Sequence, residues 1–158
     1  LVTAPGLAGL STLESESALS VAAGLEGFRL DARAFLREFD TNQVEDMVVV
    51  EDAEVLIVAI GISARAAMRA IALLRSRGVK AGLFRPITLW PFPEQALRLA
   101  ASRARVVLVP ELNFGQMRLE VERILRATRV EGLHRFDGEA IAPAQIAERA
   151  QALAKEGR

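Results

Sequence analysis

The segment Gly61–Arg65 (GISAR) has the residue types of an anion-binding turn, because it links an apolar run to a helical pattern. A strand that passes through glycine into a helix points free backbone N–H groups at one place, where they can hold a phosphate. Dinucleotide fingerprints have three glycines, and this segment has only Gly61. We therefore favour a tight turn in which Ser63 is the helix N-cap, and an anion site that includes Arg65 is the alternative.

Glu111 follows another apolar run and could act as an acid or a base. No second acid, lysine or histidine lies near it in the sequence to complete a catalytic group. Hydrogen bonding to backbone N–H groups, or to an arginine such as Arg85, is therefore the expected role of this carboxylate. Asn113 and Gln116 carry amides, which do not transfer protons, so we expect them to fix a loop or to contact a partner.

His134 is the only histidine, and the chain contains no cysteine. The lack of cysteine excludes disulfides, thiolate metal sites, iron–sulfur ligation and a cysteine nucleophile. We expect a structural role for His134 in an edge strand. The acidic pairs in residues 45–46 and 51–52 flank a short apolar run and are expected to be solvated charges. The residues thus predict no metal site and no self-sufficient catalytic set.

Charge is distributed unevenly along the 158 residues, although 20 basic and 20 acidic side chains cancel. Residues 1–54 contain three bases and eleven acids, net −8, so the remainder is net +8. The split favours docking between the halves or onto charged partners, or else it reflects ordinary solvated faces. A neutral chain with 5% aromatic residues is a poor candidate for binding nucleic acid.

No run of residues approaches the ~18 apolar positions of a membrane span, and the start lacks the pattern of a secretion signal. We therefore expect a soluble, cytoplasmic protein that does not bind membranes. Because the sequence begins with Leu1, we also expect it to be a piece of a longer protein.

The elements that must position these residues alternate between strand and helix after residue 46. Residues 1–45 are interpreted as an arm with a linker helix over 31–40, and a short helix around 15–23 is one possibility. Residues 46–158 are interpreted as one α/β domain. Strands are expected at 47–50, 54–60, 79–84, 105–109 and 130–136, and helices at 63–77, 93–102, from about 116 and from 143. This order predicts a parallel sheet with helices on both faces, whose ligands would lie beyond the carboxyl ends of the strands.

Trp90 and Phe92 lie between prolines and are too apolar to be left freely exposed. We expect them to pack in the core or at a subunit interface rather than to stack on nucleic-acid bases.

Two segments resemble signature stretches of a known family. They are Arg85–Pro93 (RPITLWPFP) and Val109–Met117 (VPELNFGQM), and they are similar to the alpha subunit of 2-oxoacid:ferredoxin oxidoreductases, in particular the 2-oxoglutarate and branched-chain 2-oxoacid members. Leu56–Ala70 and Phe136–Glu139 fit the same pattern, so the resemblance covers about residues 54–152.

The resemblance implies a transketolase C-terminal-like domain, a three-layer α/β/α sandwich. Its sheet is expected to have five strands, mostly parallel, with residues 47–50 suited to the one antiparallel strand. The parent enzymes oxidatively decarboxylate a 2-oxoacid to an acyl-CoA with thiamine diphosphate, Mg²⁺ and iron–sulfur clusters, use coenzyme A as substrate and reduce ferredoxin.

The family's Gly-Asp-Gly motif and cluster cysteines do not occur in this sequence. The thiamine-activating glutamate belongs to another domain of the family, so the resemblance gives Glu111 no such role. It implies a non-catalytic docking domain that holds no cofactor itself. Expected partners are the rest of the alpha subunit, the thiamine-binding beta subunit, ferredoxin through the complex, and a second copy. The alternative is a free-standing module that binds a nucleotide or coenzyme A at the strand edge.

Overall fold

The computed structural model describes residues 19–20, 29–30, 44–48 and 51–156 of the chain. It divides the chain into two units, Leu1–Asp40 and Thr41–Arg158. In the first unit, β1 (Leu19–Ser20) pairs antiparallel with β2 (Arg29–Leu30), so a helix is wrong for residues 19–20. The linker helix expected over 31–40 lies outside the described residues, and a domain boundary near residue 45 stays a prediction.

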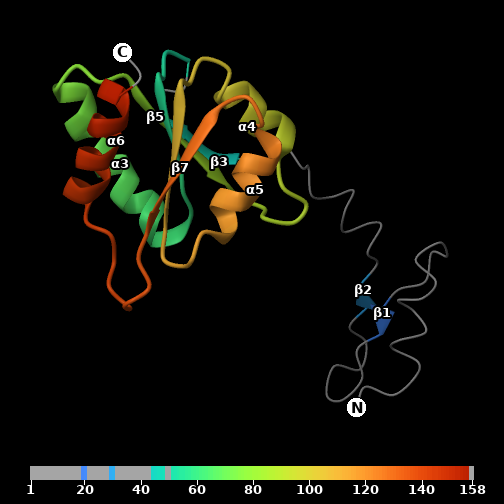
Figure 1. Cartoon of the computed structure of the whole chain (residues 1–158). Coiled ribbons are helices and arrows are strands. Elements are labelled where there is room, and N and C mark those ends of the chain that lie inside the picture. Colours follow the sequence, from blue (N-terminus) through green and yellow to red (C-terminus); the bar gives the residue numbers. More distant parts are fainter. Residues whose placement is uncertain (1–18, 21–28, 31–43, 49–50, 157–158) are drawn as a thin grey trace. The chain divides into compact units, whose positions relative to one another are not determined.

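The second unit is built on a sheet in which the strands follow the order β3-β5-β4-β6-β7 (Figure 1). These strands are β3 (Val44–Val48), β4 (Val55–Val58), β5 (Ala81–Pro86), β6 (Val106–Glu111) and β7 (Arg129–His134). The last four run parallel to their neighbours. At one edge β3 pairs antiparallel with β5, and it begins three residues before the run expected over 47–50. The predicted α/β class with a parallel sheet is confirmed.

Four helices cover the two faces of this sheet (Figure 1). They are α3 (Gly61–Ser76), α4 (Glu94–Ala100), α5 (Gln116–Ile124) and α6 (Pro143–Glu156). α3 and α6 pack on one face, and α4 and α5 on the other. No helix in the described part of the chain is long and apolar enough to cross a membrane.

The central strand β4 explains why both faces are covered. Its four residues are all buried, and side chains alternate across a strand. Val55 and Ile57 belong to the core beneath α3 and α6, whereas Leu56 and Val58 belong to the core beneath α4 and α5. The continuous apolar run in the sequence therefore correctly predicted a strand buried on both sides.

Candidate functional site

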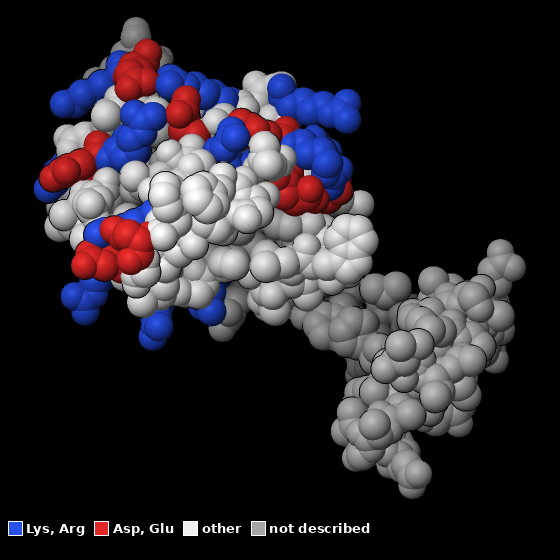
Figure 2. All heavy atoms as spheres, turned by 60° about the horizontal axis from the view of Figure 1, so that its bottom comes forward, with Lys and Arg blue, Asp and Glu red and all other residues white. Residues whose placement is uncertain are grey.

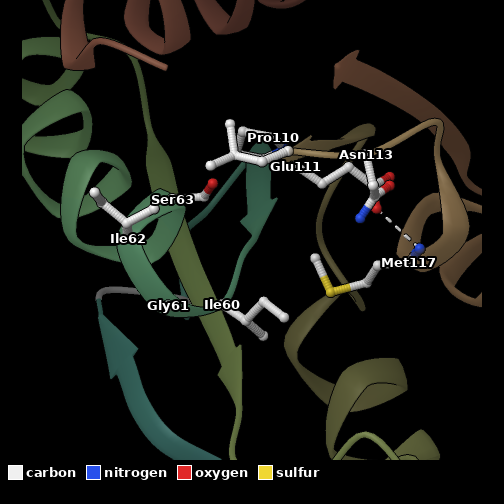
Figure 3. A pocket seen from close by; sticks show the side chains of 9 residues that line it. Ile60, Gly61, Ile62, Ser63, Pro110, Glu111, Asn113 and Met117 are labelled. Carbon is white, nitrogen blue, oxygen red and sulfur yellow. Dashed lines mark hydrogen bonds between the residues drawn. The ribbon is translucent and has the colours of Figure 1, made fainter. Parts of the chain in front are cut away.

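The candidate site lies at the carboxyl ends of β4 and β6. The chain passes from β4 to β5 on one side and later to β6 on the other, so these two ends flank the switch point of the sheet. A pocket of about 240 Å³ lies there (Figure 3). It is lined by Ile60, Gly61, Ile62, Ser63, Pro110, Glu111, Leu112, Asn113 and Met117. The topology thus brings together two segments that the sequence had marked separately.

The start of α3 forms one wall of the pocket. Gly61 has φ of +55°, a left-handed value that glycine adopts without a steric penalty. The N-cap position is taken by Ile60, and no side chain caps the helix. The prediction that Ser63 is the N-cap is therefore wrong, because Ser63 lies inside the first turn, where its side chain is buried. Arg65, on the same helix, is exposed and does not line the pocket.

Glu111 and Asn113 form the opposite wall and hold the start of α5. Glu111 is only 3% exposed, and its carboxylate accepts hydrogen bonds from the backbone N–H groups of Met117 (2.9 Å) and Arg118 (3.1 Å) (Figure 3). The side-chain oxygen of Asn113 accepts from the N–H groups of Gly115 (2.8 Å) and Gln116 (3.2 Å). These two acceptors satisfy N–H groups that a helix start leaves without an intrahelical partner. The structure therefore agrees with the expected backbone and loop-fixing roles.

His134 is the neighbour of Glu111 that sequence reasoning missed. The two residues are paired in the register of β6 and β7, and His134 Nε2 lies 3.4 Å from Glu111 Oε1. A Cβ on Gly132 would lie 2.2 Å from that nitrogen, so glycine leaves the space that the imidazole fills. Glu111 and His134 are the last residues of two neighbouring parallel strands. Their contact could therefore have been predicted from the sequence, but only if the order of the strands in the sheet had been known.

The comparison with protein families decides what this fold is. Residues 53–146 match the model of the pyruvate:ferredoxin oxidoreductase core domain II. The chain belongs to this family. This confirms the resemblance to 2-oxoacid:ferredoxin oxidoreductases that the two signature stretches carried.

Relatives of this core domain II are subunits of such enzymes. Ketoisovalerate oxidoreductase subunit VorB of Methanothermobacter marburgensis is 35% identical over 133 residues, which are 84% of this chain and 38% of the relative. 2-Oxoglutarate synthase subunit KorA of Archaeoglobus fulgidus is 40% identical over 125 residues, 78% of this chain and 35% of the relative. The chain thus spans little more than a third of the length of either relative.

Solved structures share the fold of this core domain II at low sequence identity. The 2-oxoglutarate:ferredoxin oxidoreductase of Magnetococcus marinus superposes with a TM-score of 0.62 at 22% identity, over 77% of this chain and 21% of that one. A split-gene transketolase gives 0.61 at 22% identity, over 76% of this chain and 44% of that one. The transketolase-like fold that the resemblance implied is therefore confirmed.

The cofactors of the family do not fit the described residues of this core domain II. Within the described part of the chain, no three histidine, aspartate or glutamate side chains gather where they could hold a metal ion. The full sequence has no cysteine to ligate an iron–sulfur cluster. In the pocket, the carboxylate of Glu111 is already engaged by two backbone N–H groups. We therefore derive no chemical step through thiamine diphosphate, Mg²⁺ or a cluster in this domain.

The remaining predicted residues of the core domain II lie around the pocket rather than in it. Arg85 is half-buried on β5 and does not line the pocket. Gln116 lines a second pocket of about 240 Å³, together with Leu89 and Phe92. Phe92 is buried in the core beneath α4 and α5. This is the first of the two alternatives, core or subunit interface, that we expected for it.

Trp90, by contrast, is 86% exposed in this core domain II. Packing in the core of this chain is therefore wrong for Trp90, although its expected place at an interface stays a prediction. Phe92, two residues further along the same loop, is only 7% exposed, so the two aromatic side chains of this segment lie in different environments.

Proposed function

We propose that this core domain II is a structural and subunit-docking domain of the alpha subunit of a 2-oxoacid:ferredoxin oxidoreductase. The enzyme would convert a 2-oxoacid to an acyl-CoA by oxidative decarboxylation and reduce ferredoxin, with thiamine diphosphate and iron–sulfur clusters held elsewhere in the complex. The proposed partners are the rest of the alpha subunit and the thiamine-binding beta subunit, and ferredoxin acts through the complex. The proposed location is the cytoplasm.

The bonding of Glu111 is the observation that carries the non-catalytic role. A general acid or base must be within reach of a substrate proton and must change its protonation state during the reaction. Both oxygens of Glu111 instead accept backbone N–H groups at the start of α5. With both oxygens engaged by the backbone, the position of this carboxylate suits a group that stabilises the loop and the start of the helix.

The charge of the strand edge supports docking over binding of a free coenzyme. Nucleotides and coenzyme A carry phosphates, which proteins hold with Lys, Arg or a glycine-rich cradle. Residues 59–63 and 112–116, which form most of the pocket wall, contain no Lys or Arg. The free-standing nucleotide or coenzyme A module is therefore not favoured.

The test transfers this domain into a working relative. Residues 53–146 replace the matching segment of KorA from Archaeoglobus fulgidus, and assembly of the complex and 2-oxoglutarate-dependent ferredoxin reduction are measured. We expect the chimera to assemble and to be active. Glu111→Gln in the chimera should lower thermal stability but leave kcat per assembled complex nearly unchanged. A loss of kcat on the order of 100-fold in an assembled complex is the size typical of a missing general acid or base and would refute the proposal.

A second measurement tests the chain by itself. We expect thiamine diphosphate with Mg²⁺, or coenzyme A, to leave the melting temperature of the 158-residue chain unchanged. A ligand that binds only the folded state stabilises it by an amount that grows with the logarithm of the ratio of ligand concentration to dissociation constant, and the melting temperature rises accordingly. A rise of several degrees with either ligand would show a binding site in this chain and would contradict the docking role.

A further inference from the structure

The start of α3 directs hydrogen-bond donors at the switch-point pocket without an acceptor to meet them. Ile60 has the extended backbone of an N-cap residue, with φ of −127° and ψ of 164°, and its carbonyl accepts the N–H of Ala64. Its hydrocarbon side chain cannot accept a hydrogen bond, and the first turn of the helix contains no acid. Among the described residues, the N–H groups of residues 61–63 therefore have no partner.

Ser63 adds a side-chain donor to the same pocket. The residue is only 6% exposed and lines the pocket, and Figure 3 shows its hydroxyl pointing from α3 across the pocket. This hydroxyl forms no hydrogen bond with any residue that the structure describes. A buried hydroxyl without a partner costs free energy, and folded proteins contain few of them. Its position therefore points to an occupant of the pocket that this chain does not supply.

The opposite wall of the pocket contributes a further donor. The side-chain oxygen of Asn113 is used by the N–H groups of Gly115 and Gln116. The NH₂ group of Asn113 forms no hydrogen bond within the described part of the chain, and the residue lines the pocket (Figure 3). Donors thus face the pocket from both walls. The group that complements them carries an oxygen that accepts hydrogen bonds.

The charge of the pocket favours a neutral acceptor over an anion. Among the described residues that line it, Glu111 alone is charged. A phosphate or carboxylate placed there would lie near the carboxylate of Glu111, with no cation in the lining to offset the repulsion. A backbone carbonyl, or a Ser, Thr or Asn side chain, supplies the oxygen without a charge. The pocket of about 240 Å³ can hold such a group, since a cavity of roughly 150 Å³ already holds a benzene ring.

The surroundings of the pocket suit a protein occupant. Ile62, Leu112 and Phe114 lie in the two segments that form its walls, and they are 46%, 40% and 73% exposed. Figure 2 turns this side of the molecule toward the viewer and shows a broad face without charged side chains. Exposed apolar surface of this kind is typical of a protein contact. Most of an alpha subunit lies outside this chain, which spans little more than a third of its relatives.

We propose that the rest of the alpha subunit inserts a neutral oxygen acceptor into this pocket, where it caps α3 and binds the hydroxyl of Ser63. The acceptor is a backbone carbonyl or the side chain of Ser, Thr or Asn. The positive end of the helix dipole, at the start of α3, also favours the oxygen of such a group. The proposal rests on the docking role proposed above, to which it adds the place and the chemistry of the contact.

The first test uses the 158-residue chain, in which the rest of the subunit is absent. Ser63→Ala removes a hydroxyl that has no bond to lose, so we expect the melting temperature to stay unchanged or to rise slightly. Ile60→Thr places a hydroxyl at the N-cap, whereas Ile60→Val has the same shape without that hydroxyl. We expect the Thr variant to melt roughly 3 °C above the Val variant, because it supplies the missing cap.

The second test compares this chain with the assembled KorA chimera described above, by hydrogen exchange over residues 59–64. We expect assembly to slow the exchange of these N–H groups by at least ~10-fold. Ser63→Ala should speed it again by ~5-fold, the effect of losing one hydrogen bond. The matched control is Ser76→Ala at the other end of α3, whose hydroxyl donates to the carbonyl of Leu73, and it should leave the exchange unchanged. In the assembled chimera Ile60→Thr and Ile60→Val should exchange alike, because the occupant already caps the helix.

Three results would overturn this contact alone. A melting temperature lowered by several degrees in Ser63→Ala of the free chain would show that the hydroxyl is bonded within the chain. Exchange over residues 59–64 that is as fast in the assembled chimera as in the free chain would show that nothing caps α3. A rise of several degrees in the free chain with millimolar inorganic phosphate, lost in Ser63→Ala, would show an anion site instead. A chimera that does not assemble would refute the docking role itself, and this contact with it.

Discussion

Replacing Glu111 tests whether one buried carboxylate holds the β6–α5 connection together. It is 3% exposed and accepts the N–H groups of Met117 and Arg118. A hydrogen bond to a charged group contributes about 1.5–3 kcal/mol, and a donor left buried without a partner costs a similar amount. Glu111→Ala removes both acceptors, so we expect it to lower the free energy of unfolding by about 4 kcal/mol. Glu111→Gln keeps one acceptor but places an amide NH₂ group against the other N–H. We expect this substitution to lower the free energy of unfolding by about 2 kcal/mol.

The assay is urea denaturation followed by circular dichroism, because the exposed Trp90 is a poor reporter of unfolding. A loss of 4 kcal/mol corresponds to a melting temperature lowered by roughly 15 °C or more in a domain of this size. The matched control is Glu120→Gln on α5, whose carboxylate pairs with Arg123 at the surface and should contribute under about 1 kcal/mol. If the free energy of unfolding of Glu111→Ala lies within about 1 kcal/mol of that of the unmodified chain, the carboxylate does not stabilise the start of α5 and the reasoning is wrong.

Three further substitutions test single features of the fold. Gly132→Ala should destabilise by roughly 1–3 kcal/mol, since its Cβ would lie 2.2 Å from His134 Nε2, and adding His134→Ala should recover part of that loss in urea denaturation. Gly78→Ala should cost about 1 kcal/mol in the same assay from backbone strain alone, because Gly78 has φ of +76° and nothing lies within 4 Å of the added atom. The hydrogen bond from Arg75 lowers the pKa of Asp52 below its ordinary value of 3.8. The stability that this pair supplies is therefore fully present above pH 3.8 and is lost as the pH falls through the lowered pKa of the folded state. Asp52→Asn should therefore be less stable than the unmodified chain at neutral pH, and the difference should vanish in acid; a difference that persists at the lowest pH would contradict the pairing.

Much of the fold could be predicted from local sequence patterns. The run over 54–60 is continuously apolar after Glu54 and rich in β-branched residues. Exposing such a run to water carries a high free-energy cost, so a central strand was the natural interpretation. A helix was expected to end at residue 77, and the φ of +76° at the next residue, Gly78, shows why a residue without a side chain suits that position. These features depend on a few neighbouring residues, which is why they can be found without knowing the rest of the structure.

The errors fall where tertiary structure decides. Ser63 is a good capping residue, but α3 begins two residues before it, at the left-handed Gly61, so its hydroxyl lies inside the helix. Trp90 and Phe92 are two residues apart and were expected to share a role, yet one is exposed and the other buried. The contact between Glu111 and His134 joins residues 23 positions apart and follows from the pairing of β6 with β7. No local pattern contains that information.

The switch point of the sheet clarifies how one fold can serve either binding or docking. Topology alone places a crevice between the ends of β4 and β6, whatever residues line it. A crevice that holds a phosphate needs N–H groups left free at a helix start, together with cations nearby. Here Glu111 and Asn113 occupy four N–H groups at the start of α5, and the flanking segments over 59–63 and 112–116 carry no charge. The start of α3, on the other wall, has no side-chain cap, but no Lys or Arg lines the pocket beside it. With the donors of α5 used and no cation in its lining, the crevice retains the shape of a ligand site but is better suited to a protein contact.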